Sequence, residues 1–255
     1  MQNCKATSTP VAIGEKLSSQ GDFEKVSEST YRSLVGCLLY LTTTRPDIMF
    51  AVSLLLRFMH CCNEKHFQTA KRVLMYIKGT LSYGMMFTKA ESMKLIGYAD
   101  SDWAGSIDDM KSTLGYLFTL GSAIFCWSSK KQTVVAQSTA EAEYVVAAGA
   151  VNQAIWLRKI MADLNQHQRE ATEINCDNQS AVAIAKNQVS HGRTKHFKIK
   201  FHFVRKMEQA QEVNLIHCRS EEQLADILTK PLSVLRFEDL RAKMGVCSMQ
   251  AKEEC

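Results

Sequence analysis

Residues 93–103, MKLIGYADSDW, form an apolar run that ends in two acidic residues, Asp100 and Asp102. A short run of this kind predicts a buried β-strand, so both carboxylates lie where the chain leaves the sheet. An Asp after a strand is also a common turn residue. The stretch therefore decides the fold only in combination with three further acids elsewhere in the chain.

These three acids stand in different but recognisable settings. Glu143 in AEAEYVV opens a long helical pattern, Asp177 ends the strand pattern TEINCD, and Asp226 lies in the helical pattern EEQLADILTK. Each also has an ordinary explanation: a helix dipole favours acids in its first turn, Asp caps helices, and helix faces carry solvated charges. If the fold gathers all four carboxylates, they form an oxygen-rich pocket suited to hard divalent cations.

The remaining pattern predicts alternating strands and helices after a helical start. Residues 31–78 are predicted to be helical. One helix ends before Arg45-Pro46-Asp47 and another begins there, because proline is favoured at the first position of a helix. A long helix is capped by Ser138 or Thr139. Strands are predicted at 82–88, 93–100, 114–121, 122–129, 172–177 and 213–218, and further helices at 179–187, 193–209 and 221–230.

Composition indicates an ordinary globular protein. The 255 residues are 46% hydrophobic and 22% charged, and no apolar run reaches the length of a membrane span. The N-terminus lacks the apolar segment of a secretory signal. Nine cysteines are scattered without zinc-finger spacing, which favours reduced thiols. We therefore expect an intracellular protein that is neither secreted nor bound to a membrane.

Positive charge is concentrated in the predicted helix 193–209. The formal net charge is +5, yet residues 91–255 carry equal numbers of acidic and basic residues. Within this neutral half, helical spacing puts four basic side chains on one stripe: Lys195, Lys198, His202 and Arg205. The stripe fits either a solvated helix face or contact with a nucleic-acid backbone.

Several sequence motifs, in this order, resemble the C-terminal end of a copia-type LTR retrotransposon Pol polyprotein. They are YRSLVGCLLYLTTTRPDIMFAVSLLLRFM, HFQTAKRVLMYIKGT, YADSDWAG, STAEAEY, DNQSA, RTKHF and QLADILTKPL. The resemblance implies an α/β fold with a ribonuclease H-like mixed five-stranded sheet flanked by helices and preceded by a small helical unit. Its parts are a polar arm or linker (1–28), a helical remnant of the reverse transcriptase thumb or connection region (29–90), a ribonuclease H-like domain (91–246) and a polar tail (247–255).

The same resemblance implies a hydrolase that cuts the RNA strand of an RNA–DNA hybrid. Its catalytic residues and metal ligands would be Asp100, Glu143, Asp177 and Asp226, holding two Mg²⁺ ions, with Mn²⁺ as an alternative. Asp102 is the rival of Asp100. A mobile proton-shuttling histidine would be His191 or His217, although a structural role suits each as well.

Recognition of the hybrid requires contacts to 2′-hydroxyl groups across a shallow minor groove. Polar donors follow Asp177 directly, and we expect Asn178, Gln179 and Ser180 to make such contacts. The basic stripe would supply contacts to the phosphates.

The chain departs from a whole Pol polyprotein. It has no Tyr-x-Asp-Asp polymerase motif and no zinc-binding His/Cys cluster. The pair Asp108-Asp109 does not replace the polymerase motif. We therefore expect a fragment that has lost its polymerase partner and that resides in a cytoplasmic particle or the nucleus. Alternatives are an idle nucleic-acid-binding fragment, a purely structural module or an integrase-like nuclease. The sequence sets no oligomeric state.

Overall fold

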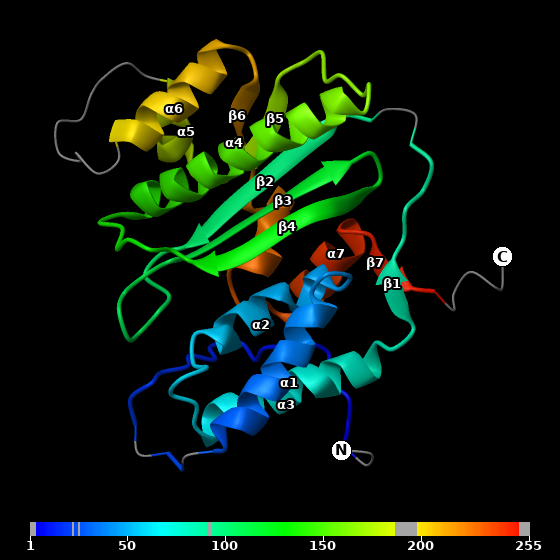
Figure 1. Ribbon diagram of the computed structural model, residues 1–255, viewed down its shortest axis with the longest axis vertical. Coiled ribbons are helices and arrows are strands. Elements are labelled where there is room, and N and C mark those ends of the chain that lie inside the picture. The colour runs from blue at the N-terminus through cyan, green and yellow to red at the C-terminus, as the bar shows by residue number, and fades with distance from the viewer. Residues whose placement is uncertain (1–3, 22, 25, 91–92, 187–197, 250–255) are drawn as a thin grey trace.

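A mixed five-stranded sheet lies at the centre of the protein, with helices on both faces (Figure 1). The computed structural model describes residues 4–21, 23–24, 26–90, 93–186 and 198–249. β2, β3 and β4 are antiparallel neighbours, whereas β5 and β6 run parallel to β2. In spatial order the strands are β4 (Ala123–Lys131), β3 (Thr113–Leu120), β2 (Leu95–Asp102), β5 (Thr172–Cys176) and β6 (Val213–His217). The predicted fold class is confirmed.

Both faces of the sheet are apolar because successive side chains of a strand point to opposite sides. Leu117 packs into the apolar core on one face, and its neighbour Phe118 packs into the core on the other. The turn between β3 and β4 contains Gly121 with φ +74°, a conformation that glycine adopts without steric cost. β3 and β4 pair antiparallel on either side of this glycine and so form a tight hairpin.

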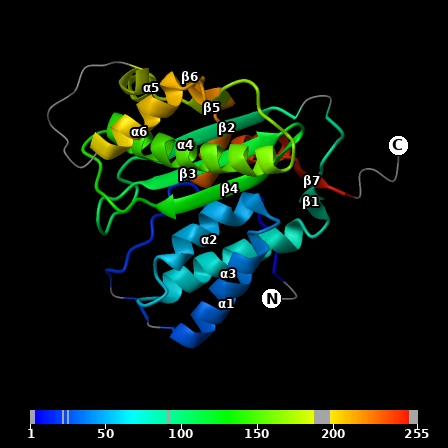
Figure 2. The same ribbon diagram turned by 45° about the horizontal axis from the view of Figure 1, so that its top comes forward.

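Helices α4 (Thr139–Asp163), α5 (Gln179–Lys186) and α6 (Lys198–Gln209) cover one face of the sheet (Figure 2). Ser138 caps α4, since its side chain accepts a hydrogen bond from the backbone N–H of Glu141. The long helix crosses β2 and is buried along most of its length.

The other face is covered by α1 (Glu28–Leu41), α2 (Met49–Leu56) and α3 (Glu64–Gly79), with the short 3₁₀ turn η1 (Pro46–Ile48) at the predicted break. One apolar core contains Val35 of α1, Leu55 of α2, Leu117 of β3 and Leu228. The helical unit and the sheet therefore share a core. The proposed division near residue 90 stays a prediction.

A buried polar network ties this helical unit to the C-terminal helix α7 (Val234–Lys243). The Arg45 guanidinium donates to both carboxylate oxygens of Asp47, at 2.9 and 2.8 Å. Tyr76 of α3 donates to Asp47 at 2.6 Å, and Arg241 of α7 donates to the Tyr76 hydroxyl at 3.1 Å. The interruption between helices at residues 45–47 is thus stabilised by charge pairing as well as by Pro46.

A second, two-stranded sheet lies apart from the main sheet and consists of β1 and β7. β1 (Tyr83–Met85) is shorter than the strand expected at 82–88 and pairs antiparallel with β7 (Val246–Ser248). Neither α7 nor β7 was predicted from the sequence. Among the described residues, no helix combines the length and apolarity needed to cross a membrane.

The helix predicted at 221–230 is wrong. The segment forms two short 3₁₀ turns, η3 (Ser220–Glu222) and η4 (Leu224–Leu228). Gln223 between them has an extended backbone, and its side chain accepts from the N–H of Ala225. Its amide also donates to the carbonyl of Ala99 on β2 at 3.0 Å, so tertiary contact with the sheet overrides the helical propensity of the segment.

Candidate metal centre

Three acidic side chains from separate elements meet at one end of the sheet. Asp100 lies near the end of β2, Glu143 in the second turn of α4, and Asp177 directly after β5. One carboxylate oxygen of each lies within 4.8 Å of the other two. β2 and β5 are parallel, so their carboxyl ends share an edge of the sheet. These three residues constitute the carboxylate trio.

Asp100 is almost completely buried, with 1% of its surface exposed. Its Oδ2 accepts a hydrogen bond from the Thr229 hydroxyl and lies 3.5 Å from Lys230 Nζ. Burial raises the pKa of the Asp100 carboxyl to about 6, although Lys230 favours the charged form. The close approach of this segment depends on Gly115, where a Cβ would lie 2.6 Å from Thr229 Cγ2 and 2.8 Å from Leu228 Cβ.

Glu143 is the most strongly perturbed member of the trio. Its Oε1 accepts a hydrogen bond from the backbone N–H of Ser101 at 2.9 Å. Its Oε2 is buried and accepts no hydrogen bond from the residues that the structure describes. Burial, with the nearby charges of Asp100 and Asp177, raises the pKa of the Glu143 carboxyl to about 9. A buried oxygen without a donor calls for a proton or a cation.

Gln132, which the sequence did not single out, holds the strand and helix together behind Glu143. It is 2% exposed, and its amide donates to Ser101 Oγ at 3.1 Å and to the Ala142 carbonyl at 3.0 Å. The end of β4 therefore fixes both β2 and the start of α4. The position of Gln132 in the sequence, a few residues before α4, does not indicate this role.

Asp177 is half-buried and stands at the open side of the trio. Burial raises the pKa of its carboxyl, and His217 on the adjacent β6 acts in the opposite direction. His217 is exposed and pairs in register with Cys176, so its imidazole lies beside the trio. His191 lies outside the described residues.

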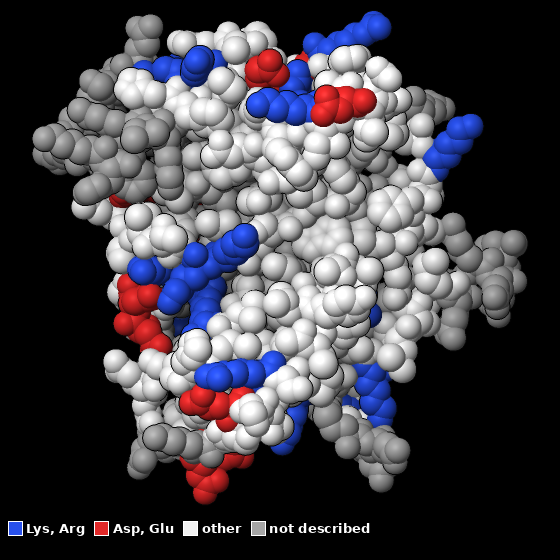
Figure 3. All heavy atoms as spheres, in the orientation of Figure 1, with Lys and Arg blue, Asp and Glu red and all other residues white. Residues whose placement is uncertain are grey.

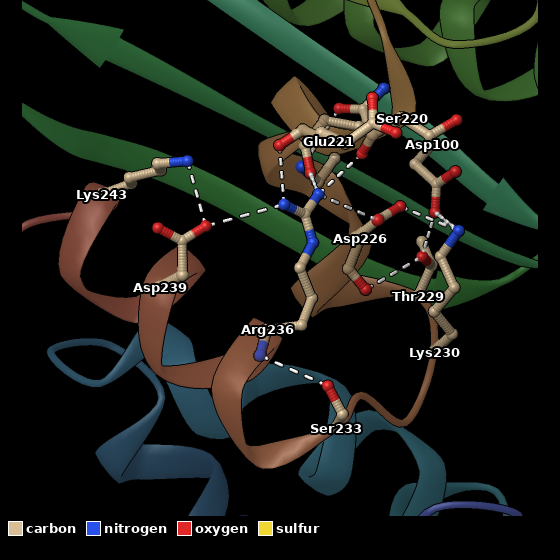
Figure 4. Close-up of polar contacts among 12 residues, drawn as sticks. Asp100, Ser220, Glu221, Asp226, Thr229, Lys230, Ser233, Arg236, Asp239 and Lys243 are labelled. Carbon is tan, nitrogen blue, oxygen red and sulfur yellow. Dashed lines mark hydrogen bonds and ion pairs between the residues drawn. The ribbon is translucent and has the colours of Figure 1, made fainter.

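Asp226, the fourth predicted acid, is buried on η4 but does not belong to the trio. Its Oδ1 lies 2.8 Å from Lys230 Nζ, and its Oδ2 lies 3.4 Å from Arg236 Nη2 (Figure 4). Lys230 therefore lies between Asp226 and Asp100. The helix that was expected to carry Asp226 is absent, and the contact between Gln223 and β2 sets its place instead.

Lys230 and Arg236 were not among the predicted site residues. Lys230 follows Asp226 by four residues, a spacing that signals an ion pair in a helix, but here the chain is in 3₁₀ and irregular conformation. Arg236 lies on α7, beyond Pro231. Only the tertiary structure brings it to Asp226.

Asp102, the rival of Asp100, is not among the grouped carboxylates of the described residues. It ends β2, and burial raises its pKa against the opposing charges of Lys230 and Arg57. The period of the strand puts both acids on one side of the sheet, but only Asp100 reaches Glu143 and Asp177.

The residues predicted to contact nucleic acid have different surroundings. Asn178 Oδ1 accepts from the backbone N–H of Ala181 and so caps α5, whereas Gln179 and Ser180 are exposed beside Asp177. His202 is exposed and Arg205 is half-buried on α6, which Lys198 begins. Lys195, and the side chain of Lys198, lie outside the part of the chain that the structure describes.

The trio fits a divalent cation. All its donors are carboxylate oxygens, which Mg²⁺ and Mn²⁺ accept, and the half-buried Asp177 is the member of the trio that solvent reaches. Glu143 Oε2 is buried without a hydrogen-bond donor from the described residues, as expected of an oxygen that a cation would engage. Asp100, Glu143 and Asp177 are the residues that would hold the ion.

The sheet order β4-β3-β2-β5-β6, with acids at the ends of β2 and β5 and on α4, defines a ribonuclease H-like α/β protein. Comparison with known proteins gives the family. The chain is 40% identical over 246 residues to the "Retrovirus-related Pol polyprotein from transposon RE1" of Arabidopsis thaliana. It is 37% identical over 258 residues to the corresponding polyprotein of transposon TNT 1-94 of Nicotiana tabacum.

These matches cover 96% and 97% of this chain, but only 17% and 19% of the relatives. The chain belongs to the Pol polyproteins of copia-type retrotransposons and spans less than a fifth of the length of these two relatives. A comparison with protein-family models finds none that matches.

Among solved structures, the chain is similar to LC11-RNase H1, isolated from compost, with a TM-score of 0.41 and 20% identity over 54% of this chain and 93% of that one. The same enzyme in complex with an RNA/DNA hybrid gives a TM-score of 0.38 and 18% identity, covering 53% of this chain and 94% of that one.

Proposed function

We propose that this chain is the ribonuclease H part of a retrotransposon Pol polyprotein and hydrolyses the RNA strand of RNA–DNA hybrids with the help of divalent cations. The observation that carries the proposal is the carboxylate trio, because three acids within 4.8 Å of one another are costly to keep without a cation. Membership of the copia-type Pol polyproteins supports the substrate class.

The cofactor in this proposal is Mg²⁺, with Mn²⁺ as a substitute, and two ions act together. When bound, such ions activate water for in-line attack and stabilise the leaving oxygen. The task of the protein is to hold acidic ligands rigidly at the edge of the sheet. Asp100 and Glu143 are fixed by hydrogen bonds from Thr229 and Ser101, and Asp226 lies next to the trio as the fourth acid.

Proton transfer to the leaving group falls to His217 in this proposal. Its exposed imidazole stands beside Asp177 at the open side of the trio, where a substrate phosphate would enter. An imidazole has one nitrogen that can accept a proton and one that can donate it, which suits His217 to proton transfer during turnover.

Recognition of the hybrid is assigned to the two helices α5 and α6. Gln179 and Ser180 are exposed at the start of α5 and would contact 2′-hydroxyl groups next to the scissile bond, with Asn178 holding the turn. On α6, Lys198, His202 and Arg205, with Lys195 before the helix, would contact phosphates. Figure 3 shows one face of the molecule, on which basic side chains form small groups, several beside acids, around an uncharged centre.

The proposal for this chain does not include DNA synthesis. The chain lacks the Tyr-x-Asp-Asp motif, so we propose that it works with a polymerase domain in another part of the parent polyprotein. Location in a cytoplasmic particle or the nucleus is part of the same proposal.

Cleavage of an end-labelled RNA–DNA hybrid tests the proposal. We expect Mg²⁺-dependent or Mn²⁺-dependent cuts in the RNA strand, loss of cleavage with a chelator, and none in duplex DNA. Asp177→Asn removes one ligand charge while keeping the shape, and it should reduce the rate by about a hundredfold or more.

The matched control is Asp163→Asn, an exposed aspartate at the far end of α4 that should cleave like the unmodified protein. Hybrid binding without cleavage would favour the idle nucleic-acid-binding fragment. Cleavage that survives Asp177→Asn would refute the assignment of the trio.

A further inference from the structure

A positively charged side chain of the protein already lies beside the metal centre. Lys230 Nζ lies 2.8 Å from Asp226 Oδ1 and 3.5 Å from Asp100 Oδ2, and so bridges two of the four predicted ligands (Figure 4). Its side chain is 37% exposed, whereas Asp226 and Asp100 are buried. The ammonium group thus lies at the solvent side of a buried acidic pair, where an incoming ion would approach.

Asp226 is held from its other side by a second cation with a different character. Arg236 Nη2 lies 3.4 Å from Asp226 Oδ2, and the guanidinium also donates to the carbonyls of Ser220 at 2.7 Å and Glu221 at 2.6 Å. With the Gln223 carbonyl at 3.3 Å, four acceptors surround this rigid planar group and leave Arg236 little freedom. It therefore fixes the position of the Asp226 carboxylate independently of Lys230.

Lys230 has the opposite properties. A lysine carries a compact charge on a flexible four-carbon stem, and this one has a partly exposed side chain. Its contacts with Asp226 and Asp100 are charge pairings that a divalent cation could replace, since the ligands would be the same oxygens. Lys230 can swing toward solvent while Arg236 keeps Asp226 in place.

We infer that the Lys230 ammonium occupies the place of the second divalent cation and that this cation binds only by displacing it. The first ion binds to the carboxylate trio, which contains neither Asp226 nor a lysine. A second ion would be held by Asp226 and Asp100, the two acids that Lys230 bridges. The two sites therefore differ in affinity in the free protein, with Lys230 as the residue that sets the difference. This inference rests on the proposed function in taking the trio as a cation site and Asp226 as a ligand of a second ion.

The chain contains a matched control for Lys230. Lys243 makes an ion pair of the same i, i+4 spacing with Asp239 at 3.0 Å on the exposed side of α7. Lys230→Met and Lys243→Met each remove one ammonium and keep most of the aliphatic stem. Only the first removes a charge next to the trio.

The experiment is a titration of the full chain with Mn²⁺ alone, without nucleic acid, in which electron paramagnetic resonance counts free ions. We expect the unmodified protein to bind one ion tightly and a second at least about tenfold more weakly. In Lys230→Met the second ion should bind about tenfold more tightly, because a neighbouring like charge is gone. Lys243→Met should match the unmodified protein, and Lys230→Arg should keep the second site weak.

The outcomes separate the inference from the proposed function. A protein that binds no Mn²⁺ at all contradicts the proposed function. A protein that binds the first ion at the trio, but whose second affinity is unchanged or weaker in Lys230→Met, overturns the role of Lys230 alone. If Lys230→Met fails to fold, equal affinity for two ions in the unmodified protein overturns it as well.

Discussion

The raised pKa of Glu143 makes the metal-free protein lose stability as the pH rises. In the fold its carboxyl has a pKa of about 9, whereas in the unfolded chain it ionises near its ordinary value of about 4.3. Between these values the folded state holds one more proton than the unfolded state. The free energy of unfolding therefore falls by about 1.4 kcal/mol per pH unit in this window.

The range from about pH 6.5 to about pH 8 lies between the ordinary pKa of a glutamate and the raised pKa of Glu143. Asp100, with a pKa of about 6, releases most of its proton below this range. Over about 1.5 pH units Glu143 alone should cost about 2 kcal/mol of stability. Glu143→Gln carries no proton to lose, and its Oε1 can still accept from Ser101, so its stability should vary less with pH by that amount.

Urea denaturation in the presence of a chelator, at several pH values, measures this difference. The control is Glu141→Gln, two residues earlier on α4, where the side chain accepts from the N–H of Gln137 at the helix start. It should keep the slope of the unmodified protein. Stability curves of Glu143→Gln and the unmodified protein that run parallel across this range would refute the reasoning. Added Mg²⁺ should flatten the slope, because a bound cation displaces the proton.

Three further predictions concern the packing and the surface. Gly115→Ala should destabilise the protein by about 1–3 kcal/mol and weaken Mn²⁺ binding, because its Cβ would push η4 away, whereas Gly149→Ala, with open space around it, should not; thermal melts and metal titration decide this. Asp47→Asn should cost about 3 kcal/mol and leave a single unfolding transition in urea, since Asp47 belongs to the buried network that reaches Arg241 through Tyr76, and the units share one core; two separate transitions would contradict this. Lys198→Met with Arg205→Met should lower the salt dependence of hybrid binding by about one unit for each phosphate that the protein no longer binds, and an unchanged slope would place the phosphates elsewhere.

Local pattern identified most of the sheet and its helices. The strand at Asp100, the long helix at Glu143 and the short strand at Asp177 follow from apolar periodicity and capping residues close by in the chain. The parallel pairing of β2 with β5 then puts three of these acids at one edge. Position after a strand or near a helix start marked these acids as candidates, and the copia-type resemblance then selected them as metal ligands.

Local pattern failed where contacts between distant residues decide the conformation. The segment around Asp226 has helical spacing, but Gln223 binds the carbonyl of Ala99, and the chain turns in 3₁₀ form instead. Gly115 matters only because η4 packs over it. The strand β1 pairs with β7 from the far end of the chain, and neither short strand has a pattern of its own.

The sequence by itself determined the α/β class, the copia-type resemblance and the acidic residues at the ends of β2 and β5 and on α4, because periodicity and short words are properties of neighbouring residues. Only the tertiary structure decided that Arg236 also binds Asp226, that Asp226 lies next to the trio and not within it, and that the helical unit shares the core of the sheet. Charge pairing and apolar packing act through space, so the spacing of Asp226 and Lys230 could signal their ion pair, but not the contacts of that pair with Asp100 and Arg236.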